Sequence, residues 1–169
     1  MPADFHFLSN FCILFEKEVL QMRTPASVGK HPIHPMVVAF PIGLWVFSLI
    51  LDVLYIIGWG GDILNDVSYY AILGGIIGAV FAAVPGFVDY LSLQGHSKTI
   101  ATWHLIANVS ALGMFAISFA LRAVDRPVLT APLILSLIGV ALIGVGGWLG
   151  GELVYVHGVA VESPEEHEH

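Results

Sequence analysis

Four long apolar stretches, separated by short polar or glycine-rich segments, dominate the chain. They cover residues 35–57, 69–91, 100–121 and 132–156. Each is long enough for the roughly 20 residues that cross the hydrocarbon core of a bilayer. Lipid offers no hydrogen-bond partners to a peptide backbone, so each stretch is predicted to be a helix. The pattern therefore predicts an all-α integral membrane protein.

The connections between these stretches are short. The predicted turns are Gly60-Gly61-Asp62, Ser92-Leu93-Gln94-Gly95 and Asp125-Arg126-Pro127, and Gly158 is the predicted stop of the last helix. Connections of this length make successive helices antiparallel neighbours. The expected architecture is an antiparallel four-helix transmembrane bundle with short loops.

Composition agrees with the bilayer as the main partner. Hydrophobic residues are 57% of the chain and charged residues 11%, whereas soluble domains have roughly 45–50% and roughly 25%. With six Lys and Arg in all, nucleic acid is not an expected partner. The single cysteine, Cys12, excludes an internal disulfide framework.

Three regions are expected along the chain. Residues 1–29 form an N-terminal extension, which is either an interfacial helix or a segment upstream of a natural start at Met22. Residues 30–161 form the four-helix transmembrane domain. Residues 162–169 form an acidic tail that is expected to be disordered.

The distribution of basic residues predicts the orientation in the membrane. Lys30 and Lys98 lie on the side shared by both termini, with Lys17 and Arg23 nearby, whereas Arg122 and Arg126 lie on the opposite side. Because cytoplasmic loops carry an excess of basic residues, both termini are expected in the cytoplasm, for a protein of a bacterial inner membrane.

Polar residues that are unusual for a membrane helix gather at the side of the termini. They are His31, His34, Asp89, His96, His104, Glu152 and His157. Ionisable side chains are costly in a bilayer and usually pair with one another, bind a ligand or line a pathway. Since every predicted helix contributes to this set, the clustering predicts a binding site.

A transition-metal site is the leading hypothesis for this cluster. Histidine is the commonest protein ligand of such metals, and carboxylates supply negative charge. The predicted ligands of an iron, zinc or copper ion are His34, Asp89, His104 and His157, with Glu152 as a weaker candidate. Asn108, one helical turn from His104, and His31 are expected to support the ligands by hydrogen bonding. Redox or electron-transfer chemistry would follow.

Two other functions remain open. One is a b-type haem protein in which two of the three histidines His34, His104 and His157 bind the iron and the glycines of the last helix make room for the ring. The other is a small proton-coupled transporter, which would need to form a homo-oligomer. Some of these residues also have a purely structural interpretation. His96 is typical of a solvated turn, and the glycines are typical of tight packing between helices.

An ion pair is predicted on the opposite side of the membrane. Asp52 lies late in the first predicted helix and Arg122 ends the third. Pairing is the simplest way to keep both charges within a membrane protein.

Several motifs resemble one family of bacterial membrane proteins. The motifs are HPIHPMVVAFPIGL at 31–44, PGFVD at 85–89, His104 with Asn108, and GWLGGELVYVHGVAV at 147–161. Together they resemble domain-of-unknown-function family 2231. The resemblance implies a four-helix membrane domain, and it favours His34, Asp89, His104 and His157 over His31 and His96. It also suggests a Rieske-type iron–sulfur protein as a redox partner.

Overall fold

The computed structural model describes residues 25–29, 31–124 and 130–161. Its four long helices are α2 (Ile33–Ile56), α3 (Asp62–Ser92), α4 (Gly95–Val124) and α5 (Ala131–Tyr155). Each is long and apolar enough to cross a membrane. The predicted all-α four-helix membrane bundle is thus confirmed. The predictions for the first 24 residues, for the turn at 125–127 and for the tail 162–169 fall outside the described residues.

Two of the helices, α3 and α4, begin several residues before their apolar stretches. Helix α3 starts at Asp62 instead of residue 69, and α4 starts at Gly95 instead of residue 100. Gly60 and Gly61 make the first turn with φ values of 83° and 67°, which residues other than glycine rarely adopt. The polar residues that follow are helical because Asn65 and Ser68 are buried inside the bundle. Hydropathy alone predicts an apolar stretch only from residue 69.

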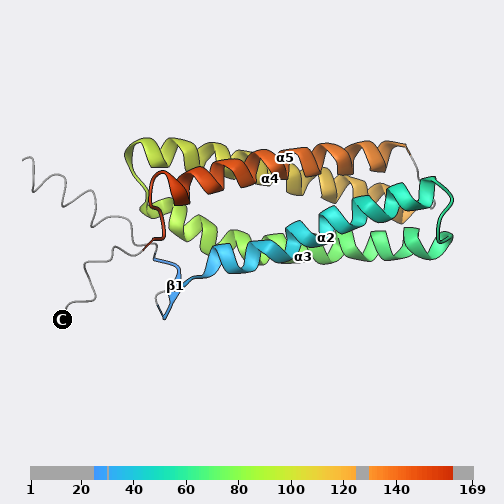
Figure 1. The fold of residues 1–169 in the computed structure, drawn as a ribbon, viewed down its shortest axis with the longest axis horizontal. Helices are drawn as coiled ribbons and strands as arrows, with labels where there is room; N and C mark the ends of the chain where they lie inside the picture. The colour runs from blue at the N-terminus through green and yellow to red at the C-terminus, as the bar shows by residue number, and fades with distance from the viewer. Residues whose placement is uncertain (1–24, 30, 125–129, 162–169) are drawn as a thin grey trace, which may run out of the picture.

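The bundle consists of two helical hairpins. Helix α2 packs along α3 and α4 packs along α5, while the contacts between the hairpins, α3 with α4 and α2 with α5, are fewer. Figure 1 shows the two hairpins side by side, with the first and last described residues at the same end of the bundle. We call this the near end and the opposite one the far end.

The centre of the bundle holds two stacked aromatic rings. Trp45 of α2 and Phe115 of α4 lie 4.4 Å apart between ring centroids and are almost parallel, at 7°. Each ring lies over a glycine, where an added Cβ would come within 2.3 Å of Trp45 at Gly75 and within 2.6 Å of Phe115 at Gly139. These glycines therefore let the two helices of each hairpin approach closely.

A buried ion pair joins the hairpins at the far end. Arg122 donates from Nη1 to Asp52 Oδ1 at 2.8 Å and from Nη2 to Oδ2 at 2.5 Å, and the two residues are only 2% and 6% exposed. Ser68 donates to Asp52 Oδ1 at 2.6 Å, and Arg122 Nε donates to the Ser118 hydroxyl at 3.4 Å. Such hydrogen bonds offset the cost of burying both charges.

Two short segments lie at the near end. Strands β1 (Ser27–Val28) and β2 (His31–Pro32) pair antiparallel and form what we call the N-terminal strap. The backbone N–H of Ala26, directly before the strap, donates to Asp89 Oδ1 at 2.9 Å, and this hydrogen bond ties the strap to the end of α3. After α5, Val159 packs against Ile100.

Candidate functional site

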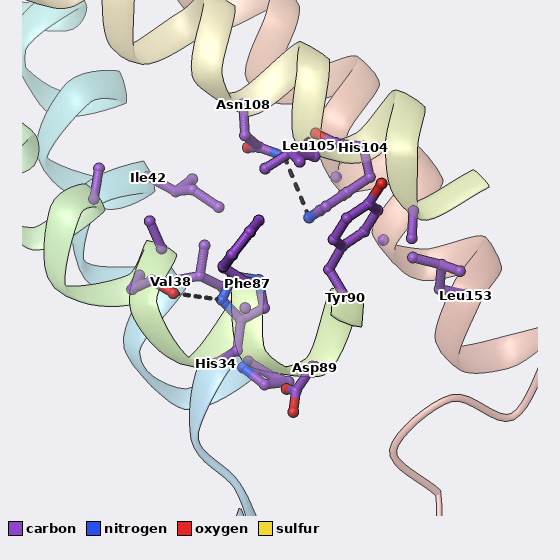
Figure 2. Close-up of a pocket in the computed structure, with 18 of the residues that line it drawn as sticks. His34, Val38, Ile42, Phe87, Asp89, Tyr90, His104, Leu105, Asn108 and Leu153 are labelled. Carbon is purple, nitrogen blue, oxygen red and sulfur yellow. Dashed lines mark hydrogen bonds between the residues drawn. The ribbon is translucent and has the colours of Figure 1, made fainter. Parts of the chain in front are cut away.

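A cavity of about 430 Å³ lies between the two hairpins toward the near end. Most of its lining is apolar or glycine, and its polar side chains are His34, Asp89, Tyr90, His104, Asn108 and Tyr155. In Figure 2, His34 reaches it from α2, and His104 and Asn108 from α4, while Asp89 and Tyr90 lie on α3. Cofactor sites are typically apolar cavities of this size with a few placed polar groups.

His34 is fixed by its own hairpin. Its Nδ1 lies 2.9 Å from the carbonyl oxygen of Ala82 on α3. Since a carbonyl only accepts, Nδ1 carries the hydrogen, and Nε2 of the neutral ring has a free lone pair. A Cβ at Gly86 would come within 2.7 Å of this same Nδ1. Glycine at 86 is therefore needed for the ring to lie against α3.

His104 is fixed by the other hairpin in the same way. Its Nδ1 lies 2.8 Å from the carbonyl oxygen of Gly146 on α5, so here too the hydrogen is on Nδ1. A Cβ at Gly150, one turn after Gly146, would lie 3.1 Å from Cε1 of the ring. Both imidazoles therefore donate from Nδ1 to backbone and keep Nε2 for another partner.

The two imidazoles lie next to each other between the hairpins, with their ring planes almost perpendicular. Their centroids lie 6.1 Å apart and their planes are at 85°. Metal–imidazole nitrogen bonds are about 2.0–2.1 Å long, so two rings on opposite sides of one ion have centroids about 6–6.5 Å apart. The observed centroid spacing of 6.1 Å lies within this range.

Asn108 lies beside His104. Its Nδ2 donates to the His104 carbonyl oxygen at 2.8 Å and lies 3.3 Å from His104 Nε2. An amide nitrogen has two hydrogens, so it can serve both acceptors. Gly146 gives this side chain its place, because a Cβ there would come within 2.7 Å of Asn108 Nδ2.

Asp89 has a structural contact already. It is 8% exposed, and its Oδ1 accepts the Ala26 N–H of the strap. Figure 2 shows its carboxylate close to His34, at the edge of the cavity. Asp89 therefore holds the strap next to the histidine pair.

The other predicted residues lie elsewhere. The predicted ligand His157 follows α5 and packs against His96, with ring centroids 5.4 Å apart. His31, which was expected to support the ligands, is an exposed residue of strand β2. Among the described contacts, none joins the Glu152 side chain to a histidine. The described residues contain no group of three His, Cys, Asp or Glu side chains that could hold a metal ion.

The cavity has features that residue types alone did not indicate. The hydrogen-bond acceptors that orient the histidines are backbone carbonyls, of Ala82 and Gly146, and no side-chain pattern reports them. Gly147 also lines the cavity, and an added Cβ there would meet nothing within 4 Å. The glycines of α5 thus have two roles, since Gly139 and Gly150 seat rings while Gly147 leaves space.

Comparison with known proteins gives a family. The model of a family of predicted membrane proteins, DUF2231, matches residues 30–163. No curated protein and no solved structure matches the chain. The match covers all four helices and both histidines of the cavity, and the chain therefore belongs to the DUF2231 family of predicted membrane proteins.

Proposed function

We propose that the protein is a membrane redox protein that binds one haem b between its hairpins, and that His34 and His104 would hold its iron. The observation that carries the proposal is the spacing of 6.1 Å between two imidazoles that come from opposite hairpins. Haem b supplies a one-electron iron couple, and two histidines with an apolar slot are sufficient to hold it.

The hydrogen bonds of both rings support this assignment. Histidines that bind metal usually donate their other ring N–H to a carbonyl or carboxylate, which fixes the tautomer and the ring orientation. His34 and His104 do so through Nδ1, to Ala82 and Gly146. The Nε2 of His34 is therefore held available, whereas the Nε2 of His104 accepts from Asn108 at 3.3 Å, a hydrogen bond that an iron ligand would replace.

The size and the lining of the cavity are consistent with a bound cofactor. The cavity volume of about 430 Å³ lies within the range of about 300–1,000 Å³ typical of ligand sites. Gly147 lines the cavity at an exposed position of α5, and an added Cβ there would meet no atom within 4 Å. An apolar lining also excludes water from such a ligand and so influences its redox potential.

The position of the site suggests how electrons would enter and leave. His34 is the second residue of α2, so the site lies near one face of the membrane and not at its centre. We propose that the protein exchanges electrons at this face, with a partner such as a Rieske-type protein. For a protein of a bacterial inner membrane, the basic residues favour this face, and both termini, in the cytoplasm. A homo-oligomer is also expected. Reporter fusions at Val161 and Gly61 should score cytoplasmic and external, and the reverse result would invert the orientation.

Titration of the purified protein with hemin tests the binding proposal. Wild-type protein in detergent should take up one equivalent, with a sharp Soret band that shifts on reduction, whereas His34→Ala and His104→Ala should leave the spectrum of free hemin. Folded wild-type protein that leaves hemin unbound but retains zinc or iron by elemental analysis would replace haem by a bare metal ion. Binding of neither would leave proton transfer as the remaining function.

A further inference from the structure

Helices α2 and α4 carry the same set of functional positions. His34, Trp45, Ser48 and Asp52 of α2 have counterparts 70 residues later in α4, namely His104, Phe115, Ser118 and Arg122. The four positions comprise a cavity histidine, a central aromatic ring, a serine that is 0% exposed and a buried charge. Little of this is visible as sequence identity, because two of the four pairs differ in residue type.

Helices α3 and α5 match with a separation of 64 residues. Gly75 and Gly139 seat Trp45 and Phe115. The carbonyls of Ala82 and Gly146 accept from His34 and His104, and Gly86 and Gly150 lie against those same imidazoles. Each hairpin therefore contains one histidine, one carbonyl acceptor and two glycines in equivalent places.

Equivalent residues also contact each other across the bundle. His34 faces His104 at 6.1 Å, Trp45 stacks on Phe115 at 4.4 Å, and Asp52 pairs with Arg122. In a twofold arrangement, residues on the axis meet their own counterparts. Three such meetings along the bundle define one axis that runs from the near end to the far end.

We infer that the two hairpins are two copies of one two-helix unit, related by a pseudo-twofold axis along the membrane normal, and that the ligand site lies on this axis with one histidine from each copy. Both first helices run from the near end, so the repeat is parallel and not inverted. This inference deepens the proposed function, on which its ligand rests. It implies that one ligand lies on the axis and makes equivalent contacts with both copies.

The charged positions distinguish the two copies. Asp52 and Arg122 are equivalent but opposite in sign. If the first hairpins of two chains paired with each other, two Asp52 carboxylates would be buried together. If the second hairpins paired, two Arg122 guanidinium groups would be buried together, and either arrangement is costly. The pair therefore directs each first hairpin to a second hairpin.

Exchange of axis residues tests the repeat by thermal unfolding of the full-length protein in detergent, which needs no ligand. Asp52→Arg and Arg122→Asp should each lower Tm strongly, and the double exchange should recover most of the loss. The double variant Trp45→Phe, Phe115→Trp should likewise have a higher Tm than the sum of the two single losses predicts. Double exchanges as unstable as that sum would overturn the repeat.

Paired glycine variants supply a second measurement and separate this inference from the proposed function. Gly75→Ala and Gly139→Ala should lower Tm to a similar extent, while Gly86→Ala and Gly150→Ala should both weaken hemin binding. Effects confined to one hairpin would overturn the repeat. If the wild-type protein binds no hemin but the exchanges and the first glycine pair behave as stated, the proposed function fails and the repeat stands.

Discussion

His34 and His104 lie with ring centroids 6.1 Å apart, and each donates its Nδ1–H to a backbone carbonyl of its own hairpin. Metal-binding histidines show this combination because the second hydrogen bond fixes the ring. His157, in contrast, pairs with His96. The cofactor is therefore expected to depend on one histidine pair and not on the other.

Replacement of each histidine by alanine tests this division. His34→Ala and His104→Ala should reduce bound haem to background, because one axial ligand is lost in each case, while His96→Ala and His157→Ala should keep more than half of it. Haem per chain in the purified proteins is the measurement. A loss at His157 equal to that at His34 would restore His157 as a ligand.

A side chain at Gly147 should block the site without harming the fold. Gly147 lines the cavity and has open space where a Cβ would go, so Gly147→Leu should lower hemin affinity at least tenfold with little change in Tm. Gly144→Leu is the matched control, since Gly144 also has open space but does not line the cavity. Equal affinities for the two variants would show that the ligand does not use this wall.

Asp89 is expected to act through the strap. Asp89→Asn keeps an oxygen that can accept the Ala26 N–H, so haem content and resistance to proteolysis should stay near wild type. Asp89→Ala removes the acceptor and should speed proteolytic cleavage near residue 26. If Asp89→Asn already abolishes the bound cofactor, the carboxylate is needed as a ligand, as the metal hypothesis predicted.

The far-end ion pair should behave as a coupled unit. Asp52→Asn and Arg122→Gln should each destabilise the protein by about 3–5 kcal/mol, because each leaves a buried charge without its partner. The double variant should cost less than the sum. Urea or thermal unfolding in detergent gives the cycle. Additive losses would mean that the contact contributes no coupling energy.

Hydropathy was sufficient for the fold but not for the helix ends. Four apolar stretches specify four spanning helices because a bilayer permits little else. The start of α3 was missed because Asn65 and Ser68 are polar, yet both are buried inside the bundle. A polar residue that packs between helices has the same local signature as a loop residue.

The site could be predicted only in part. The sequence indicated which histidines are unusual and at which end they lie, because membrane depth follows from position along a helix. It did not indicate that His104 meets His34 while His157 meets His96, since this depends on how the hairpins are rotated. The repeat was also missed, because Trp45 and Phe115, or Asp52 and Arg122, match in position and not in residue type.

The absorption spectrum of wild-type protein, purified from haem-replete cells and quantified after extraction of its pigment, tests the central claim most directly. The account predicts one haem b per chain, with a Soret band and a reduced spectrum typical of two histidine ligands. Folded protein that is colourless and carries no haem would contradict it.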